Sequence, residues 1–331
     1  MNQNITYTPP FKLTDKMFSL VSEIMENIGL LSSINDLEKL PKLRKVSRLK
    51  SIHSSLAIEN NSLSFEEIND VIDGKKVLGK EDDILAVKNA FKAYKLIPEL
   101  NPYSLDDLLK THSIMMKDLV IEAGSLRSGG VGVFDSNGNL VHMAPPAKII
   151  KEDMLNLLEW LKETKTNTLI ASSIFHYEFE FIHPFGDGNG RIGRLWQTVI
   201  LTKWKPIFAW IPIESIIKDN QENYYKAIEN STKEGSSTTF IEFMLSCIKD
   251  AIMDILKESK AHYNHLSKQV GALMKVIRYY PQSAKELMKK LGLKSRNSFR
   301  DNYLNPGLEA GLIVMTYPDK PKSKNQEYYK K

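Results

Sequence analysis

Twelve residues near the middle of the chain, from His183 to Arg194, constrain its structure more than any other segment. They read HPFGDGNGRIGR, and Gly186, Gly188 and Gly190 are expected to give the backbone positive φ values that bulkier residues resist. Such a segment predicts a tight loop whose amide N–H groups converge on an anion. A helical pattern resumes after Asn189, so the loop should lie at a helix N-terminus, which favours negative charge.

The side chains of this segment are those that a phosphate-handling site requires. Arg191 and Arg194 are three residues apart and share a helix face, where each guanidinium can bind phosphate oxygens. Asp187 is a hard oxygen ligand suited to magnesium, and His183 can accept a proton from an attacking hydroxyl, a role worth roughly 10²–10⁴-fold in rate. The alternative is a glycine-rich turn beside a core histidine, but the co-occurrence of all these residues favours a functional site.

The segment resembles the core motif of the Fic family, HPFx(D/E)GNGRxxR, which it matches without a gap. The resemblance implies transfer of AMP from ATP to a hydroxyl side chain of a target protein, with pyrophosphate leaving. It implies that His183 deprotonates that hydroxyl and that Asp187 binds Mg²⁺. The nucleotide would be held by Gly186, Asp187, Gly188, Asn189, Gly190, Arg191 and Arg194, the last of them at the γ-phosphate. Relatives that act as kinases tend to have lysine at the position of Gly190, so nucleotidyl transfer is favoured.

A second resemblance lies upstream, where SLAIEN, from Ser55 to Asn60, fits the inhibitory motif of the family, (S/T)xxxE(G/N). Ser55 and Glu59 are four residues apart, so they share a face of the helix that the preceding apolar residues predict. If this helix packs beside the phosphate site, Glu59 pairs with Arg194 and keeps that arginine from the γ-phosphate. A charge-assisted bond of about 1.5–3 kcal/mol is enough to regulate. The alternative is an ordinary exposed glutamate near a helix end.

Two short apolar runs, 131–134 and 139–143, flank Asn137-Gly138 and predict a β-hairpin. Its place in the chain resembles the flap of the family, which lies over the active site and pairs with the target segment by strand addition. Val131, Gly132 and Val133 are accordingly expected at the nucleotide. The alternative is a surface hairpin that has no partner.

Tyr224 and Tyr225 fall where members of the family often have a tyrosine pair near the base. A tyrosine can stack on adenine or form a hydrogen bond with it. Packing of both rings in the helical core is the alternative, and the sequence does not decide between the two.

Composition is that of an ordinary globular chain, with 42% apolar and 26% charged residues. Cys247 is the one cysteine, so no intrachain disulfide forms and a reducing compartment is expected. No run approaches the roughly 18 apolar residues of a membrane helix, and no positive region followed by an apolar run opens the chain. These features predict a cytoplasmic protein without a membrane partner.

The C-terminal part of the chain is strongly basic and has its own pattern. From Lys257 onward, 16 Lys and Arg stand against 6 Asp and Glu, a net charge of +10 where the whole chain has +5. Ser283 and Glu286 form a capping box before a helix that should run to Leu291. A second helix, 296–304, and two strands, 312–317 and 326–329, complete the pattern of a winged helix.

The second helix of this module has polar residues that suit contacts to DNA phosphates or bases: Arg296, Asn297, Ser298 and Arg300. Winged helices also dock proteins, and a basic excess is often a solvated face. DNA is therefore a secondary candidate partner, behind a target protein with a Ser, Thr or Tyr hydroxyl or the chain itself as target.

The predicted fold is mainly α, with a Fic-type helical core, a β-hairpin flap and a C-terminal winged helix-turn-helix. Helices are expected at 12–30, 64–75, 81–97, 104–122, 146–164, 167–182, 189–203, 220–234 and 238–262. The predicted domains are an N-terminal helical region with the inhibitory helix (1–100), the core (101–262) and the winged helix (263–331).

Three functions fit this sequence. The first is a protein adenylyltransferase, self-inhibited through Glu59 and Arg194. The second keeps the site but removes AMP from a target, or uses another nucleotide donor. The third is a winged-helix DNA-binding regulator whose Fic-like core is a sensor.

Overall fold

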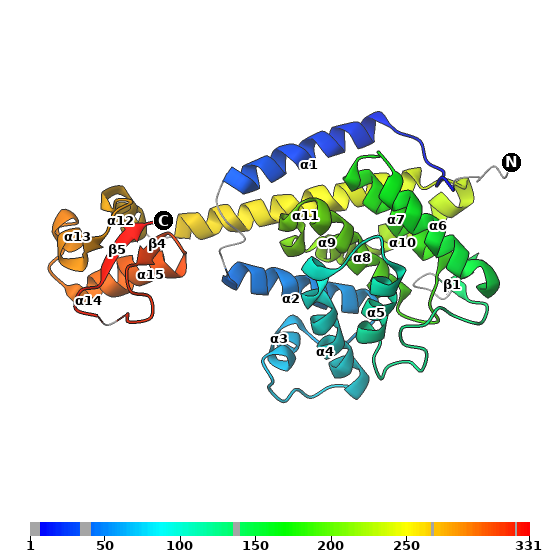
Figure 1. Ribbon diagram of the computed structural model, residues 1–331, viewed down its shortest axis with the longest axis horizontal. Helices are drawn as coiled ribbons and strands as arrows, with labels where there is room; N and C mark the ends of the chain where they lie inside the picture. Colours follow the sequence, from blue (N-terminus) through cyan, green and yellow to red (C-terminus); the bar gives the residue numbers. More distant parts are fainter. Residues whose placement is uncertain (1–6, 34–40, 135–139, 266–267, 322) are drawn as a thin grey trace. The chain divides into compact units, whose positions relative to one another are not determined.

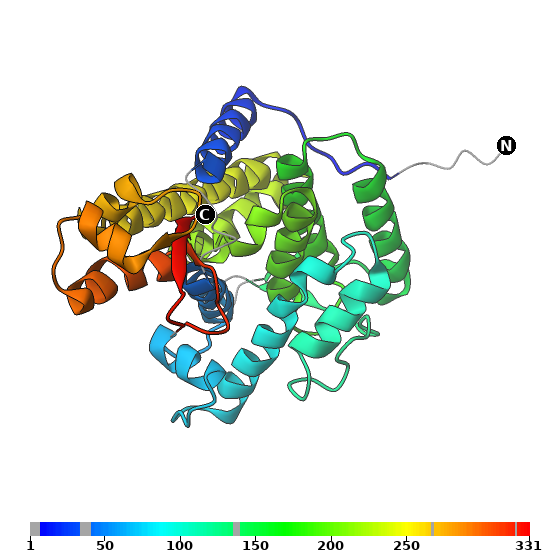
Figure 2. The same ribbon diagram turned by 60° about the vertical axis from the view of Figure 1, so that its left-hand side comes forward.

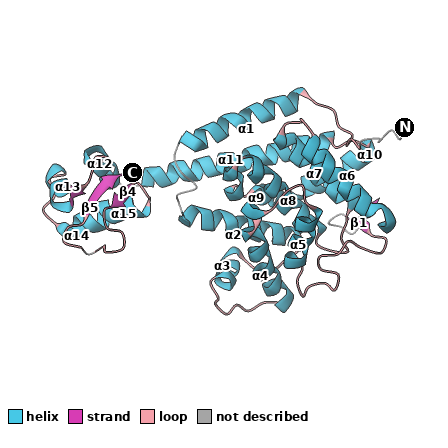
Figure 3. Ribbon diagram, in the orientation of Figure 1, coloured by secondary structure: helices cyan, strands magenta, loops and turns pink. Residues whose placement is uncertain are grey.

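The computed structural model describes residues 7–33, 41–134, 140–265, 268–321 and 323–331. The chain divides into two compact units, one formed by Met1–Leu30 and Lys42–Met253 and the other by Leu31–Pro41 and Asp254–Lys331. Both units are mainly helical, and strands are confined to short segments (Figures 1 and 3). The predicted mainly α fold is therefore confirmed.

The first unit is built from helices, together with one β-hairpin. Its helices are α1 (Asp15–Ser33), α2 (Pro41–Ile58), α3 (Phe65–Ile72), α4 (Glu81–Lys95), α5 (Leu105–Met115), α6 (Ile150–Glu163), α7 (Thr168–Ile182), α8 (Asn189–Trp204), α9 (Ile213–Asp219), α10 (Gln221–Glu234) and most of α11 (Thr238–His265). The hairpin pairs β1 (Gly132–Phe134) with β2 (Leu140–Met143) in antiparallel register. The predicted turn at Asn137-Gly138 lies outside the described residues.

Helix α7 is the buried centre of this unit. Its sequence is apolar on every side, and nearly all of its residues are inaccessible to solvent. It packs lengthwise against α8 (Figure 2). An edge-to-face contact between the rings of His176 and Phe240 joins it to α11. Phe175, Phe179 and Trp196 are fully buried, and each such side chain contributes about 1.5–3 kcal/mol through removal from water. The pair α7–α8 is therefore a rigid support for the loop that connects the two helices.

Two features of the first unit differ from the sequence prediction. Helix α5 ends at Met115 rather than near residue 122, and Asp118 within the predicted range takes a left-handed backbone conformation that a helix cannot contain. Helix α9 was not predicted, since its seven residues are too few to show a clear period.

The second unit has the arrangement of a winged helix. Its elements are α12 (Lys268–Val276), β3 (Gln282–Ser283), α13 (Ala284–Lys290), α14 (Arg296–Phe299), α15 (Asn305–Glu309), β4 (Ile313–Met315) and β5 (Glu327–Lys330). The strands form an antiparallel sheet in the order β3-β5-β4. The core of the unit consists of Leu273, Ile277, Leu287, Phe299, Leu304, Ile313 and Tyr328.

The predicted helices and wing of this unit are present, with three differences. Strand β3 was missed because it is two residues long. Ser283 caps α13 by accepting a hydrogen bond from the Glu286 amide, but the Glu286 carboxylate accepts from Gln282 and Lys290, so only half of the capping box forms. The helical path also continues past Pro306 to Glu309, because a wide turn at Arg300–Leu304 precedes it and proline is tolerated in a first helical turn.

Candidate active site

The loop between α7 and α8 carries the predicted site, and two left-handed residues bracket it. His183 ends α7 with φ of 49°, and Gly188 precedes α8 with φ of 86°. The expectation of positive φ is confirmed for Gly188 and wrong for Gly186 and Gly190. The left-handed conformation of His183, which few residues other than glycine adopt, was not predicted.

Gly190 is required for space rather than for its φ value. A Cβ atom at this position would collide with the Glu59 carboxylate and would lie 2.9 Å from the Arg194 guanidinium. A side chain here would therefore separate these two groups. Gly186 has no such constraint, since the nearest atom to its Cβ position is a Glu122 carboxylate oxygen at 3.9 Å.

Buried polar side chains fix the shape of the loop. The Asn189 amide accepts a hydrogen bond from the Phe185 N–H (2.9 Å) and donates one to the Phe185 carbonyl (2.8 Å). His112 stacks on the Phe185 ring at 3.7 Å and lies 2.9 Å through Nε2 from the Asp187 carbonyl. Because His112 Nδ1 accepts from the Gly124 N–H, its proton is on Nε2, and burial lowers the pKa of this neutral ring. The side chain of Asn189 therefore shapes the loop. The backbone N–H of Asn189, at the start of α8, is the group that would bind an anion.

Arg127 connects the loop to the segments that precede β1 and follow β2. Its buried guanidinium donates to the carbonyl oxygens of His183 (2.7 Å), Gly129 (2.7 Å) and Pro145 (2.6 Å). Its backbone N–H donates to the Pro184 carbonyl at 2.9 Å. This residue was not predicted as part of the site, although it stands at the start of the hairpin sequence.

His183 has the tautomer that a general base needs. Its Nδ1 lies 3.3 Å from the Glu180 backbone carbonyl, which can only accept, so the proton is on Nδ1 and the lone pair is on Nε2. The side chain is 17% exposed, so the ring is neither enclosed in the core nor fully solvated.

Glu180 is a buried carboxyl group next to this histidine. Its Oε2 lies 4.0 Å from His183 Nδ1, and its Oε1 has no hydrogen-bond partner within the described part of the chain. Burial raises the pKa of Glu180 to about 8, and the Glu59 charge adds to this while Arg194 opposes it. Gly193 makes room for the group, since a Cβ there would lie 2.6 Å from Oε1.

His176 and Glu178 on the same helix are satisfied core residues. His176 Nδ1 donates to Gln197 Oε1 at 2.7 Å, and burial lowers its pKa to about 3, so it is neutral. Its approach to Glu180 at 3.8 Å is therefore not an ion pair. The Glu178 carboxylate accepts a 2.6 Å hydrogen bond from the Tyr7 hydroxyl.

Asp187 and Arg191 lie at the start of α8 with groups available to a ligand. Asp187 Oδ1 accepts from the Gly188 N–H (2.6 Å) and from Arg191 (2.9 Å), and the Asp187 side chain is 57% exposed. Arg191 Nε is buried without a partner among the residues that the structure describes. The buried Arg191 Nε is suited to donate to a phosphate oxygen, and the half-exposed Asp187 carboxylate is suited to bind the divalent cation that accompanies a phosphate. Within the described ranges, no group of three His, Cys, Asp or Glu residues comes together as a metal site.

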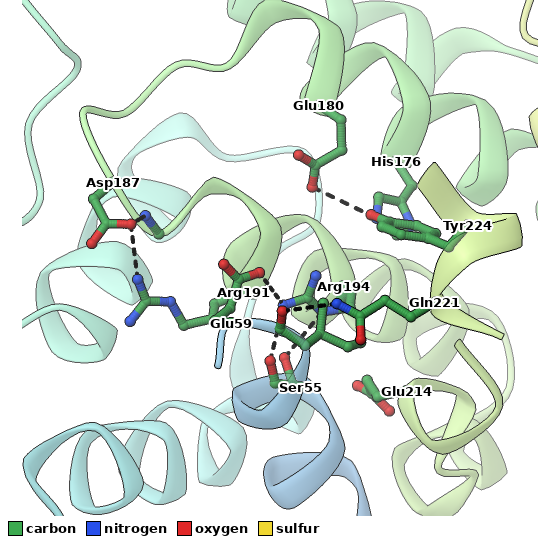
Figure 4. A network of polar contacts seen from close by, with 12 residues as sticks. Ser55, Glu59, His176, Glu180, Asp187, Arg191, Arg194, Glu214, Gln221 and Tyr224 are labelled. Carbon is green, nitrogen blue, oxygen red and sulfur yellow. Dashed lines mark hydrogen bonds and ion pairs between the residues drawn. The ribbon is translucent and has the colours of Figure 1, made fainter. Parts of the chain in front are cut away.

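The structure brings Glu59 and Arg194 together, as predicted (Figure 4). Arg194 donates to Glu59 Oε1 at 2.7 Å, to the Ser55 carbonyl at 3.0 Å and to Ser55 Oγ at 3.2 Å. The arginine side chain is 1% exposed, and the glutamate side chain is 31% exposed. Burial acts to lower the Arg194 pKa, but the nearby Glu59, Tyr224 and Glu180 together raise it above its ordinary value. Helix α2 ends at Ile58, and Asn60, with φ of 63°, follows Glu59 in a left-handed conformation that stops the helix from continuing.

The remaining predicted residues are the tyrosine pair and the start of the hairpin. Tyr224 is buried, and its hydroxyl lies 3.1 Å from His176 Nε2, whereas Tyr225 is half-buried with its ring against that of Tyr224. The Val131 carbonyl accepts from the Ala144 N–H at the base of the hairpin. Arg127 joins the base of the hairpin to this loop, because its guanidinium donates to the carbonyl groups of both His183 and Gly129.

Comparison with known proteins gives two family matches. Residues 102–201 match the Fic/DOC family, and residues 268–329 match the family described as "Filamentation induced by cAMP protein Fic-like, C-terminal domain". A Fic family protein from Desulfovibrio desulfuricans G20 has a crystal structure that is 44% identical, with a TM-score of 0.75 and 98% coverage of both chains.

More distant relatives are named protein adenylyltransferase Fic. The protein from Nematostella vectensis is 27% identical over 227 residues, which are 64% of this chain and 50% of that protein. The protein from Drosophila mojavensis is 26% identical over 245 residues, which are 70% of this chain and 46% of that protein. The chain therefore spans about half the length of the curated relatives it matches. No helix in the described part of the chain is long and apolar enough to cross a membrane.

Proposed function

Since this chain belongs to the Fic/DOC family, we propose that it is a protein adenylyltransferase that transfers AMP from ATP to a hydroxyl side chain of a target protein. We further propose that the ion pair between Glu59 and Arg194 holds it in a self-inhibited state. The distant relationship to protein adenylyltransferases supports the first proposal. The ion pair between Glu59 and Arg194 supports the proposal of self-inhibition.

The proposed reaction is the displacement of pyrophosphate by an alcohol. The target oxygen attacks the α-phosphorus of ATP, a new P–O bond forms, and the bond from that phosphorus to the oxygen of the leaving pyrophosphate breaks. His183 accepts the hydroxyl proton on Nε2, the nitrogen left unprotonated because Nδ1 faces the Glu180 carbonyl. The resulting imidazolium lies beside the Glu180 carboxyl group, which can stabilise the added charge in its ionised form.

The phosphates would be held by the start of α8. Backbone N–H groups after Gly188 point to the N-terminal side of the helix, where negative charge is favoured. Arg191 Nε is a buried donor without a described partner and would bind a phosphate oxygen. Asp187 would hold Mg²⁺, which when bound neutralises phosphate charge and helps the pyrophosphate to leave.

The single observation that supports inhibition is the set of bonds that Arg194 makes. Among the residues that the structure describes, the side chain of Arg194 donates only to Ser55 and Glu59, and it is almost fully buried, so its donors are engaged away from a γ-phosphate. A γ-phosphate that enters must replace the Glu59 carboxylate, since two negative groups at one guanidinium repel each other. The triphosphate would otherwise bind in a pose that misplaces its α-phosphorus.

The reaction is tested with ATP labelled at either the α- or the γ-phosphate. In the presence of Mg²⁺, the Glu59→Gln variant should transfer the α-label to protein and leave the γ-label in pyrophosphate. Transfer of the γ-label would identify a kinase, and loss of label from a pre-modified target with the wild type alone would identify AMP removal. Glu159→Gln, an exposed glutamate on α6, is the matched control and should behave as wild type.

A further inference from the structure

A cavity of about 670 Å³ lies in the second unit, between α13, the start of α14 and the segment that joins β4 to β5. All of its lining residues fall between Ser283 and Tyr328, so it is distinct from the loop between α7 and α8. Its volume is in the range of sites that bind small molecules. Nothing in the proposed AMP transfer uses it.

The charged residues that line the cavity are all cations: Lys285, Lys289, Arg296 and Lys324. None of these four forms an ion pair with any residue in the described part of the unit. Nearby carboxylates are already paired elsewhere, Glu286 with Lys290 at 2.8 Å and Asp301 with Arg300 at 2.8 Å. Four cations that converge on one recess without a carboxylate repel each other, and an anionic ligand would relieve that repulsion.

The other lining residues indicate that the ligand is more than an anion. Met288 and Leu293 are half-buried, and the buried ring of Tyr328 adds a flat apolar surface. Gln326 is also buried, and its Oε1 accepts no hydrogen bond from any described residue. A phosphodiester has no donor for this oxygen at neutral pH, whereas a nucleobase or a ribose has N–H or O–H groups.

We propose that this cavity binds a mononucleotide-sized molecule with at least one phosphate group. The four cations hold the phosphate, the faces of Met288, Leu293 and Tyr328 contact the base, and Gln326 accepts a hydrogen bond from the nucleoside. The negative phosphate backbone of duplex DNA would also complement the positive charge of the four cations. It would present only acceptor oxygens to the recess, however, so it would leave Gln326 Oε1 unpaired.

The experiment uses the full-length protein and the photoactivatable probe 8-azidoadenosine 5′-monophosphate, followed by mass spectrometry of the cross-linked peptides. Peptide mapping separates this cavity from the loop at 183–194. We expect cross-links within 283–328 that AMP prevents and that adenosine at the same concentration does not. AMP should also compete at lower concentration than inorganic phosphate.

The double variant Lys289→Ser/Arg296→Ser should lose at least tenfold in labelling of 283–328 and keep its labelling elsewhere. The matched double variant Lys290→Ser/Arg300→Ser removes the same charge outside the cavity and should label as wild type. All four side chains are exposed, and circular dichroism would check that each variant folds.

Four results would overturn the proposal. They are absence of labelling in 283–328, equal competition by adenosine and AMP, equal loss in the two double variants, and competition by a short duplex DNA at lower concentration than AMP. The last result would identify the cavity as part of a nucleic-acid contact.

Discussion

Replacement of Arg127 by alanine tests whether one buried side chain holds the catalytic turn and the hairpin together. The change removes three short hydrogen bonds, to the carbonyl oxygens of His183, Gly129 and Pro145, and leaves these groups without their donor. Each hydrogen bond from a charged donor is worth about 1.5–3 kcal/mol, but such terms do not add fully. A buried carbonyl group left without a donor costs about 1–3 kcal/mol, so for the three together we expect a loss of about 3–5 kcal/mol.

The expected loss can be measured as a shift in the melting temperature. In a domain of this size, each kcal/mol lowers Tm by about 2–4 °C, so Arg127→Ala should melt at least about 6 °C below wild type. Thermal unfolding followed by circular dichroism measures this directly. In the Glu59→Gln background, AMP transfer should fall more than ATP binding, because the His183 turn loses its anchor while the start of α8 keeps its own bonds.

Two further variants make this test specific. Arg127→Lys keeps the charge but cannot reach three carbonyl groups at once, so it should fall between wild type and alanine. Arg300→Ala removes an exposed arginine that pairs only with its neighbour Asp301, and it should change stability by less than about 0.5 kcal/mol. A melting temperature of Arg127→Ala within about 1 °C of wild type, with unchanged transfer, would refute the role given to this residue.

The remaining predictions concern three residues of the loop and its support. His183→Ala in the Glu59→Gln background should bind ATP as before, measured by calorimetry, and transfer AMP at least about a hundredfold more slowly; unchanged transfer would remove it as the base. Asn189→Ala leaves the Phe185 N–H and carbonyl unpaired and should cost about 2–4 kcal/mol in urea unfolding, whereas a cost near zero would mean that the loop relaxes freely. Glu180 has a pKa raised from 4.5 to about 8, so the folded protein binds a proton that the unfolded chain releases between these values. Wild-type stability should therefore fall as pH rises from 4.5 to 8 relative to Glu180→Gln, and parallel stability curves would contradict the buried carboxyl group.

The sequence was most informative where spacing along one element decides which side chains meet. Ser55 and Glu59 are four residues apart, so the sequence predicted that they share a helix face, and both bind Arg194. The contact between Glu59 and Arg194 spans 135 residues, and only the resemblance of two motifs to one family indicated it.

The supporting residues were missed because their partners are distant in sequence and their roles depend on tertiary packing. His112 reaches the Asp187 carbonyl across 75 residues, and Arg127 reaches the His183 carbonyl across 56. Both bind backbone carbonyl groups, which every residue has, so the identity of the partner leaves no trace in the sequence. The role of Gly190 could not be predicted from the sequence for the same reason. It leaves space for the Glu59 carboxylate, which comes from a distant part of the chain.

The central claim is that Glu59 restrains AMP transfer by occupying Arg194. Intact-protein mass spectrometry after incubation with ATP and Mg²⁺ measures it most directly, with the rate of AMP addition compared between wild type and Glu59→Gly. Loss of a charge-assisted bond of about 1.5–3 kcal/mol predicts a roughly ten- to hundredfold faster addition of AMP in the variant, on itself or on a protein of the lysate. Equal rates in the two proteins, or an added mass other than that of AMP, would contradict the claim.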